Sequence, residues 1–289
     1  NLSVAPPLDV AGPESNPTAY PESAGIPYNV RENIVIVPFN DPAGLEAAFA
    51  AHGHEAAVLL MEPINYDQGC ILPKPGFVQL CRELCDRYGV ILFFDEVLTA
   101  FRVAPGGAQE YLGVTPDLCV LGKAFGGGTP ISALTGRRRV MEHLRPLGNA
   151  EMSGTYLAHP TTVLGSLAAL GEYSKPGFYE RLDAVGEYFY SGFQSLIDKH
   201  AIPLRLQYAG PRFGLYFGVT SEVTNYRQAA AKRKDMEFAF IDGCYRRGVY
   251  FAVSPHHGFS AAHTEAEMDR VLAAADGALG EVGEKFGVR

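Results

Sequence analysis

Two patterns of apolar residues alternate between residues 33 and 136 of the chain. Short runs are apolar throughout, as buried strands are, and longer stretches place apolar side chains three or four residues apart, as amphipathic helices do. The patterns predict strands at 33–40, 55–63, 90–96, 117–122 and 131–136, and helices at 41–53 and 76–89. Buried strands separated by helices indicate an α/β fold, with a largely parallel sheet and helices on both of its faces.

After about residue 160 the helical spacing dominates. We expect helices at 160–173, 176–202 and 264–282, and strands at 213–219 and 248–254. Thr264 and Glu267 stand three residues apart at the start of the last helix, which is the spacing of a capping box. The change near Lys175 predicts a large domain over residues 1–174 and a smaller α+β domain over residues 175–289.

The composition argues against some classes of partner. The net charge of the 289 residues is −8, whereas surfaces that bind nucleic acid or anionic membranes are basic. No run of the sequence is long and apolar enough to cross a membrane. The five cysteines are an odd number in a long chain, so we expect no disulfide framework and favour a reducing, cytoplasmic compartment. Cys81 and Cys85 are expected to face the core from a helix.

Three charged residues directly follow predicted strands. Glu62 comes after AVLLM, Asp95 after ILFF, and Lys123 after LCVLG. A single charged side chain at a strand end commonly just meets water, but the ligands of open α/β sheets bind beyond the carboxyl ends of the strands. Because three such groups fall at one edge of the predicted sheet, we interpret them as a candidate site.

Two chemistries combine an acid at a strand end with a lysine beside glycines. ILFFDE resembles the acidic strand of an ATPase, but a phosphate-binding loop needs glycines before its lysine and a hydroxyl after it, and here Ala124 follows. In pyridoxal phosphate enzymes a lysine forms a Schiff base with the cofactor, and an acid keeps the ring nitrogen protonated. Lys123 and Asp95 suit those roles, because glycines 126–128 remove side chains around the amine and let the backbone turn sharply.

Four segments carry a family pattern: DEVLTAFR (95–102), GVTPDL (113–118), LGKAFGGG (121–128) and GTYLAHP (154–160). Together they resemble the class III pyridoxal-phosphate aminotransferases, most closely the subgroup that contains glutamate-1-semialdehyde 2,1-aminomutase. The resemblance covers most of the chain. It implies the fold of type I pyridoxal phosphate enzymes, pyridoxal 5'-phosphate as cofactor, a homodimer with shared active sites, and transfer of an amino group from an amino donor to a keto acceptor.

The resemblance also implies roles for individual residues. Lys123 matches the Schiff-base lysine, Asp95 matches the partner of the ring nitrogen, and Val97 matches the residue packed under the ring. The other implied cofactor contacts are Glu62 near the site, Asp67 and Gln68 on the hydroxyl side of the ring, and Thr155 at the phosphate of the neighbouring subunit.

Plainer interpretations exist for several of these positions. Val97 fits an ordinary strand core, Thr155 fits a helix cap ahead of a proline, and arginines 137–139 fit a solvated helix start. Arg212 is a candidate contact for a substrate carboxylate, while Arg102 belongs to the DEVLTAFR motif.

The chain departs from the family pattern in two places. Family members carry a further N-terminal segment that supplies the phosphate cup, and we expect this chain to lack it, which leaves a truncated, non-catalytic form as an alternative. The aminomutase subgroup has a glutamate where this chain reads SPHHGF (254–259), and His256 takes that position. An aminotransferase that releases its keto product is therefore favoured over an aminomutase.

Overall fold

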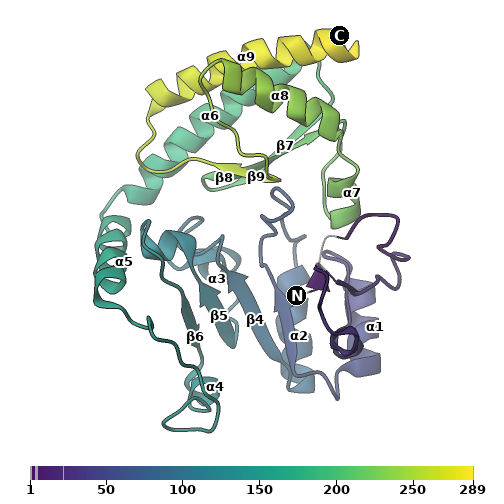
Figure 1. The fold of residues 1–289 in the computed structure, drawn as a ribbon, viewed down its shortest axis with the longest axis vertical. Helices are drawn as coiled ribbons and strands as arrows, with labels where there is room; N and C mark the ends of the chain where they lie inside the picture. The colour runs from purple at the N-terminus through teal and green to yellow at the C-terminus, as the bar shows by residue number, and fades with distance from the viewer. Residues whose placement is uncertain (1, 4–5, 22, 289) are drawn as a thin grey trace.

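The computed structural model describes residues 2–3, 6–21 and 23–288, and a four-stranded sheet forms the middle of its lower half in Figure 1. The sheet has the order β3 (Val58–Met61), β4 (Ile91–Glu96), β5 (Leu118–Leu121) and β6 (Ala133–Gly136). β3, β4 and β5 run parallel, and β6 pairs with β5 in the antiparallel direction. This confirms the largely parallel sheet, and the carboxyl ends of three strands meet at one edge.

Two helices cover one face of this sheet. They are α1 (Pro42–His52) and α2 (Phe77–Tyr88). The Asp41 side chain caps α1 by accepting a hydrogen bond from the Gly44 N–H at 3.0 Å. Cys81 and Cys85 are buried between α2 and the sheet as free thiols, so the prediction that they face the core is confirmed. On the opposite face Leu60 of β3 is 60% exposed.

A second, antiparallel sheet lies in the C-terminal part of the chain (Figure 1). It consists of β7 (Leu204–Ala209), β8 (Arg212–Phe217) and β9 (His256–Gly258). α6 (Phe178–His200), α8 (Lys234–Arg246) and α9 (Glu265–Phe286) pack their apolar sides against one face of it. The predicted capping box at the start of α9 is present. The described chain therefore has separate cores around its two larger sheets, while the boundary near residue 175 stays a prediction.

The remaining elements are short, apart from α5. They are β1 (Leu2–Ser3), β2 (Tyr20–Pro21), η1 (Tyr28–Asn33), α3 (Gly107–Leu112), η2 (Lys123–Gly126), α4 (Arg138–Met141), α5 (Pro160–Tyr173) and α7 (Tyr226–Ala230).

Two predicted strands are wrong. Residues 34–38 and 249–252 form no strand, although Phe39 and Phe251 at these segments pack against the two cores. Apolar runs report burial, and burial does not require a strand partner. The interpretation of arginines 137–139 as a solvated helix start is confirmed, because all three are exposed where α4 begins, and Arg137 and Arg139 also pair with the buried carboxylate of Asp117.

Candidate active site

The parallel register places two acids at the same level of the sheet. Met61 lies opposite Phe94, so Glu62 and Asp95 come next on adjacent strands. Burial raises the pKa of Glu62 to about 7, and the negative charges of Asp67 and Asp95 add to this. The structure thus brings three of the predicted carboxylates together.

Asp95 lies on the face of the sheet opposite α1 and α2, because side chains alternate along β4 and its neighbours Phe94 and Glu96 are buried. One carboxylate oxygen of Asp95 accepts a hydrogen bond from the Val97 N–H at 3.0 Å. No lysine or arginine of the described residues lies within ion-pair distance of Asp95. Its carboxylate therefore remains available to a cationic ligand.

Lys123 follows β5 with an unusual backbone. Its φ is 46°, in the left-handed region that residues with a side chain rarely adopt. Such a conformation costs on the order of 1 kcal/mol and is concentrated at functional sites. Gly122, just before it, packs beside Val97, since a Cβ at Gly122 would lie 3.5 Å from Val97 Cγ1. Lys123 and Val97 therefore extend from adjacent strands at the same edge as the acids.

The amine of Lys123 has a lowered pKa. Burial is the main cause, and the positive charges of Arg102 and Arg212 add to it, against the opposing charges of Asp67 and Glu62. A lower pKa leaves more of the amine neutral near physiological pH, and the neutral amine is the nucleophilic form.

A loop between β3 and α2 carries the predicted residues Asp67 and Gln68. Glu62 Oε2 accepts hydrogen bonds from the backbone N–H groups of Tyr66 at 3.1 Å and Asp67 at 3.4 Å. The Tyr216 hydroxyl accepts from Cys70 N at 2.8 Å and donates to the Gln68 carbonyl at 2.9 Å. The second sheet thus holds the loop that borders the site.

Two residues at the start of β8 and in β9 complete the cluster. Arg212 donates a hydrogen bond to Nδ1 of His256, and His256 Nε2 lies 3.9 Å from Asp67 Oδ1. Burial lowers the pKa of His256 to about 4, helped by the charges of Arg212 and Lys123. The sequence indicated both residues singly but not as a pair, because the strand that joins them was predicted at 248–254 instead of 256–258.

Thr155 is the predicted site residue that the structure does not bring to the cluster. It lies in an exposed segment before α5, and no hydrogen bond or ion pair links it to Lys123 in the described part of the chain. Its neighbours Tyr156 and Leu157 are 80% and 55% exposed.

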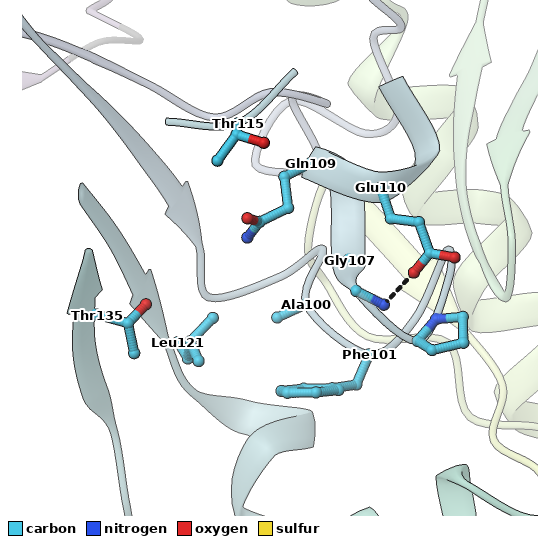
Figure 2. Close-up of a pocket in the computed structure, with 10 residues that line it drawn as sticks. Ala100, Phe101, Gly107, Gln109, Glu110, Thr115, Leu121 and Thr135 are labelled. Atoms are coloured by element: carbon cyan, nitrogen blue, oxygen red, sulfur yellow. Dashed lines mark hydrogen bonds between the residues drawn. The ribbon is translucent and has the colours of Figure 1, made fainter. Parts of the chain in front are cut away.

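A separate cavity of about 440 Å³ lies beyond the Phe101 ring. Figure 2 shows Gln109 and Glu110 of α3 on one side of it and Leu121 and Thr135 of β5 and β6 on the other. None of the predicted site residues lines this cavity. The candidate site is therefore the charged cluster at the sheet edge.

A family model described as aminotransferase class-III matches residues 17–254. The chain belongs to the class-III aminotransferase family. Its fold resembles an omega-transaminase from Sphaerobacter thermophilus, at 29% sequence identity and a TM-score of 0.88, over 98% of this chain and 64% of that chain. It also resembles a β-phenylalanine aminotransferase from Variovorax paradoxus, at 28% identity and a TM-score of 0.79, over 93% of this chain and 60% of that one.

A third similar structure is a glutamate-1-semialdehyde aminomutase from Pseudomonas aeruginosa PAO1, with 26% identity and a TM-score of 0.77 over 90% of this chain and 60% of that one. The chain thus spans 60% to 64% of the length of these three relatives. Membership of this family argues against the ATPase interpretation of ILFFDE. None of the described helices is both long and apolar enough to span a membrane.

Proposed function

We propose that this class-III chain is part of an enzyme that moves an amino group from an amino donor to a keto acceptor with pyridoxal 5'-phosphate. The observation that carries the proposal is Lys123, a lysine with a left-handed backbone and a lowered pKa at the strand edge that also carries Asp95. Solved relatives include a transaminase with pyridoxal phosphate bound, at 25% identity.

The residues at the edge suit this cofactor. A partly neutral amine can bond to an aldehyde, and an unpaired carboxylate can hold a protonated ring nitrogen. Val97 offers an apolar surface beside Gly122, where the absent side chain leaves space next to the lysine. Bound there, the cofactor supplies an electron sink for bonds at the donor carbon.

The chain's own residues would then divide the work. Lys123 would hold the cofactor through its Nζ, and its freed amine would accept a proton from the donor carbon and return it. Asp95 would keep its negative charge opposite the ring nitrogen. Glu62, Asp67 and Gln68 would border the hydroxyl side of the ring, on the loop that Tyr216 holds.

An aminotransferase is favoured over an aminomutase by His256. The resemblance puts a glutamate of the aminomutase subgroup at this position, and the imidazole here is neutral and hydrogen-bonded to Arg212. It cannot replace a carboxylate in holding a cationic intermediate. A non-catalytic form that does not bind the cofactor is the other alternative, and the test below separates it.

We also propose that the enzyme works as a homodimer in which Thr155 reaches the phosphate in the neighbouring site. Thr155 lies among exposed apolar side chains, which a second subunit would bury. These are Met152, Tyr156, Leu157, Leu164 and Leu167. Light scattering on the purified protein tests this, and a monomer at micromolar concentration contradicts it. The free, buried state of all five cysteines supports a reducing, cytoplasmic location.

The test of the function is a visible absorbance spectrum with added pyridoxal phosphate, followed by borohydride reduction and peptide mapping. We expect a yellow band and a pyridoxyl group on Lys123. Lys123→Ala should abolish both, whereas Lys175→Ala, which removes an exposed lysine paired with Glu172, should leave both unchanged. A colourless wild-type protein without modified lysine contradicts the proposal.

A further inference from the structure

The junction between α5 and α6 contacts two loops of the candidate site through tyrosine hydroxyls. Tyr173, the last residue of α5, donates a hydrogen bond to the Ala124 carbonyl at 2.9 Å. Tyr179, in the first turn of α6, donates to the Phe101 carbonyl at 3.2 Å. Ala124 directly follows Lys123, and Phe101 belongs to the DEVLTAFR motif. One junction therefore holds both the turn of Lys123 and the loop after β4.

Both carbonyls lie at or next to a residue in the left-handed region. The φ angle is 57° at Phe101 and 46° at Lys123. Residues with a side chain keep such a conformation only where the surrounding structure imposes it. Each tyrosine hydroxyl fixes the orientation of a peptide plane at one of these positions, so it opposes relaxation of the backbone.

The turn after Lys123 also lies directly against α5. Ser166 of α5, which is 3% exposed, donates to the Phe125 carbonyl at 2.7 Å. A Cβ at Gly127 would lie 2.5 Å from the Cβ of Ala169, so a residue with a side chain would clash at this position. Two hydrogen-bonded carbonyls and close packing on α5 thus fix the turn that carries the lysine.

Aromatic rings connect the two loops with the junction. Phe101 stacks with Phe125 and with Tyr173, at 6.1 Å between ring centroids in each pair. Phe178, which is buried, contacts Tyr173 at 5.3 Å and Tyr179 at 5.2 Å between centroids. Because packed aromatic rings prefer a few defined arrangements, these contacts hold the two hydroxyls in place.

The position of the Lys123 amine determines its electrostatic surroundings. Burial lowers its pKa most, and the positive charge of Arg102 lowers it further. The other charges that act on the amine are those of Arg212, Asp67 and Glu62. Arg102 lies on the loop after β4, so that loop places the guanidinium as the turn places the amine. An ammonium group is strongly hydrated, so a lysine on a released turn would move into water and away from Arg102.

We propose that Tyr173 and Tyr179 are positioning residues for Lys123. Their hydroxyls hold the two left-handed backbone segments and so keep the lysine amine beside the Arg102 guanidinium. The proposal rests on the proposed function, in which this amine bonds to the cofactor. No motif indicated either tyrosine, because they lie 49 and 78 residues from the carbonyls that they bind.

The test is the pH profile of Lys123 acetylation by acetic anhydride, measured by peptide mass mapping on the purified full chain without cofactor. Lys175, an exposed lysine, is the reference in the same sample. In the wild type the midpoint for Lys123 should lie below that for Lys175. In Tyr173→Phe it should rise, so that Lys123 reacts about threefold or more slowly at a fixed pH below both midpoints, since the neutral fraction of an amine falls about tenfold per unit of pKa.

Tyr179→Phe should raise the midpoint as well, and Tyr188→Phe is the matched control. The Tyr188 hydroxyl, also on α6, bonds to the exposed carboxylate of Asp269, so this variant should keep the wild-type midpoint. Ser166→Ala removes the second α5 donor from the turn and replaces Tyr173→Phe as the test if circular dichroism shows that Tyr173→Phe is unfolded. Equal midpoints for Lys123 and Lys175 in the wild type, or a wild-type midpoint in the folded variants of the turn, overturn the inference.

Uptake of pyridoxal phosphate gives a second readout. The yellow band should form about threefold or more slowly in Tyr173→Phe than in Tyr188→Phe, because less of the amine is neutral. Equal rates in these two variants overturn the inference. A colourless wild-type protein contradicts the proposed function alone, since acetylation needs no cofactor and its midpoints still decide whether the tyrosines position the amine.

Discussion

The hydroxyl of Tyr216 is expected to control both stability and cofactor affinity. It joins the second sheet to the loop of Asp67 and Gln68 through two hydrogen bonds, from Cys70 N at 2.8 Å and to Gln68 O at 2.9 Å. The Tyr216 side chain is 1% exposed, so water does not replace these bonds. Tyr216→Phe keeps the ring and leaves one N–H and one carbonyl without their partner.

The expected loss follows from those two groups. Each buried polar group left without its partner costs about 1–3 kcal/mol, so we expect the free energy of unfolding to fall by about 2–6 kcal/mol. Gly69, whose φ is 108°, approaches this hydroxyl so closely that a Cβ there would lie 2.5 Å from it. The loop therefore has little room to move and find new partners while the phenol ring stays in place.

Urea denaturation followed by circular dichroism measures the stability, and titration with pyridoxal phosphate followed by absorbance measures the affinity. Tyr208→Phe is the control, because Tyr208 is 41% exposed and its hydroxyl makes no hydrogen bond among the described residues. We expect Tyr216→Phe alone to lose stability and to bind the cofactor more weakly. A change below about 0.5 kcal/mol in Tyr216→Phe would show that the hydroxyl does not hold the loop.

Two further predictions concern the acids of the site. Burial raises the pKa of Glu62 from 4.5 to about 7, so between these values the folded protein keeps a proton that the unfolded chain has lost. The free energy of unfolding should therefore fall, by up to about 3 kcal/mol, as the pH rises through this window. Glu62→Gln should remove this pH dependence in urea titrations at successive pH values. An unchanged pH dependence in the variant contradicts the raised pKa of Glu62. Asp95→Asn can keep the hydrogen bond from Val97 N but loses the charge, so we expect amino transfer to slow by about 100-fold or more with the fold intact. Stopped-flow absorbance checks this against Asp86→Asn, an exposed acid paired with Arg82, and equal rates in the two variants would exclude the role of Asp95.

Local sequence was sufficient to predict the strands that carry the site residues. The apolar runs before Glu62, Asp95 and Lys123 predicted β3, β4 and β5, because apolar residues without alternation are typical of parallel strands, although Leu60 of β3 is exposed here. The order of acid, lysine and glycines then singled out one chemistry over nucleotide binding. These inferences needed only residues within a few positions of each other, and the register confirmed that they meet at one edge.

Local sequence did not predict features that depend on residues distant in the chain. Residues 249–252 are apolar because Phe251 fills the core under β8, not because they pair in the sheet. The run of arginines 137–139 gave no sign that Asp117, some twenty residues earlier, was buried and needed cations. Arg82 of α2 and both Arg137 and Arg139 at the start of α4 pair with that carboxylate.

The sequence by itself determined the fold class, the acid and lysine pair, and the family. Only the tertiary structure paired Arg212 with His256, which are 44 residues apart, and Tyr216 with Cys70, which are 146 apart. Spacing along a chain encodes which face of a helix or strand is buried, since that depends on near neighbours. Which partner a polar side chain meets depends on how whole sheets pack, and the packing of the second sheet on the loop of Asp67 decided where Arg212 and His256 lie relative to that loop.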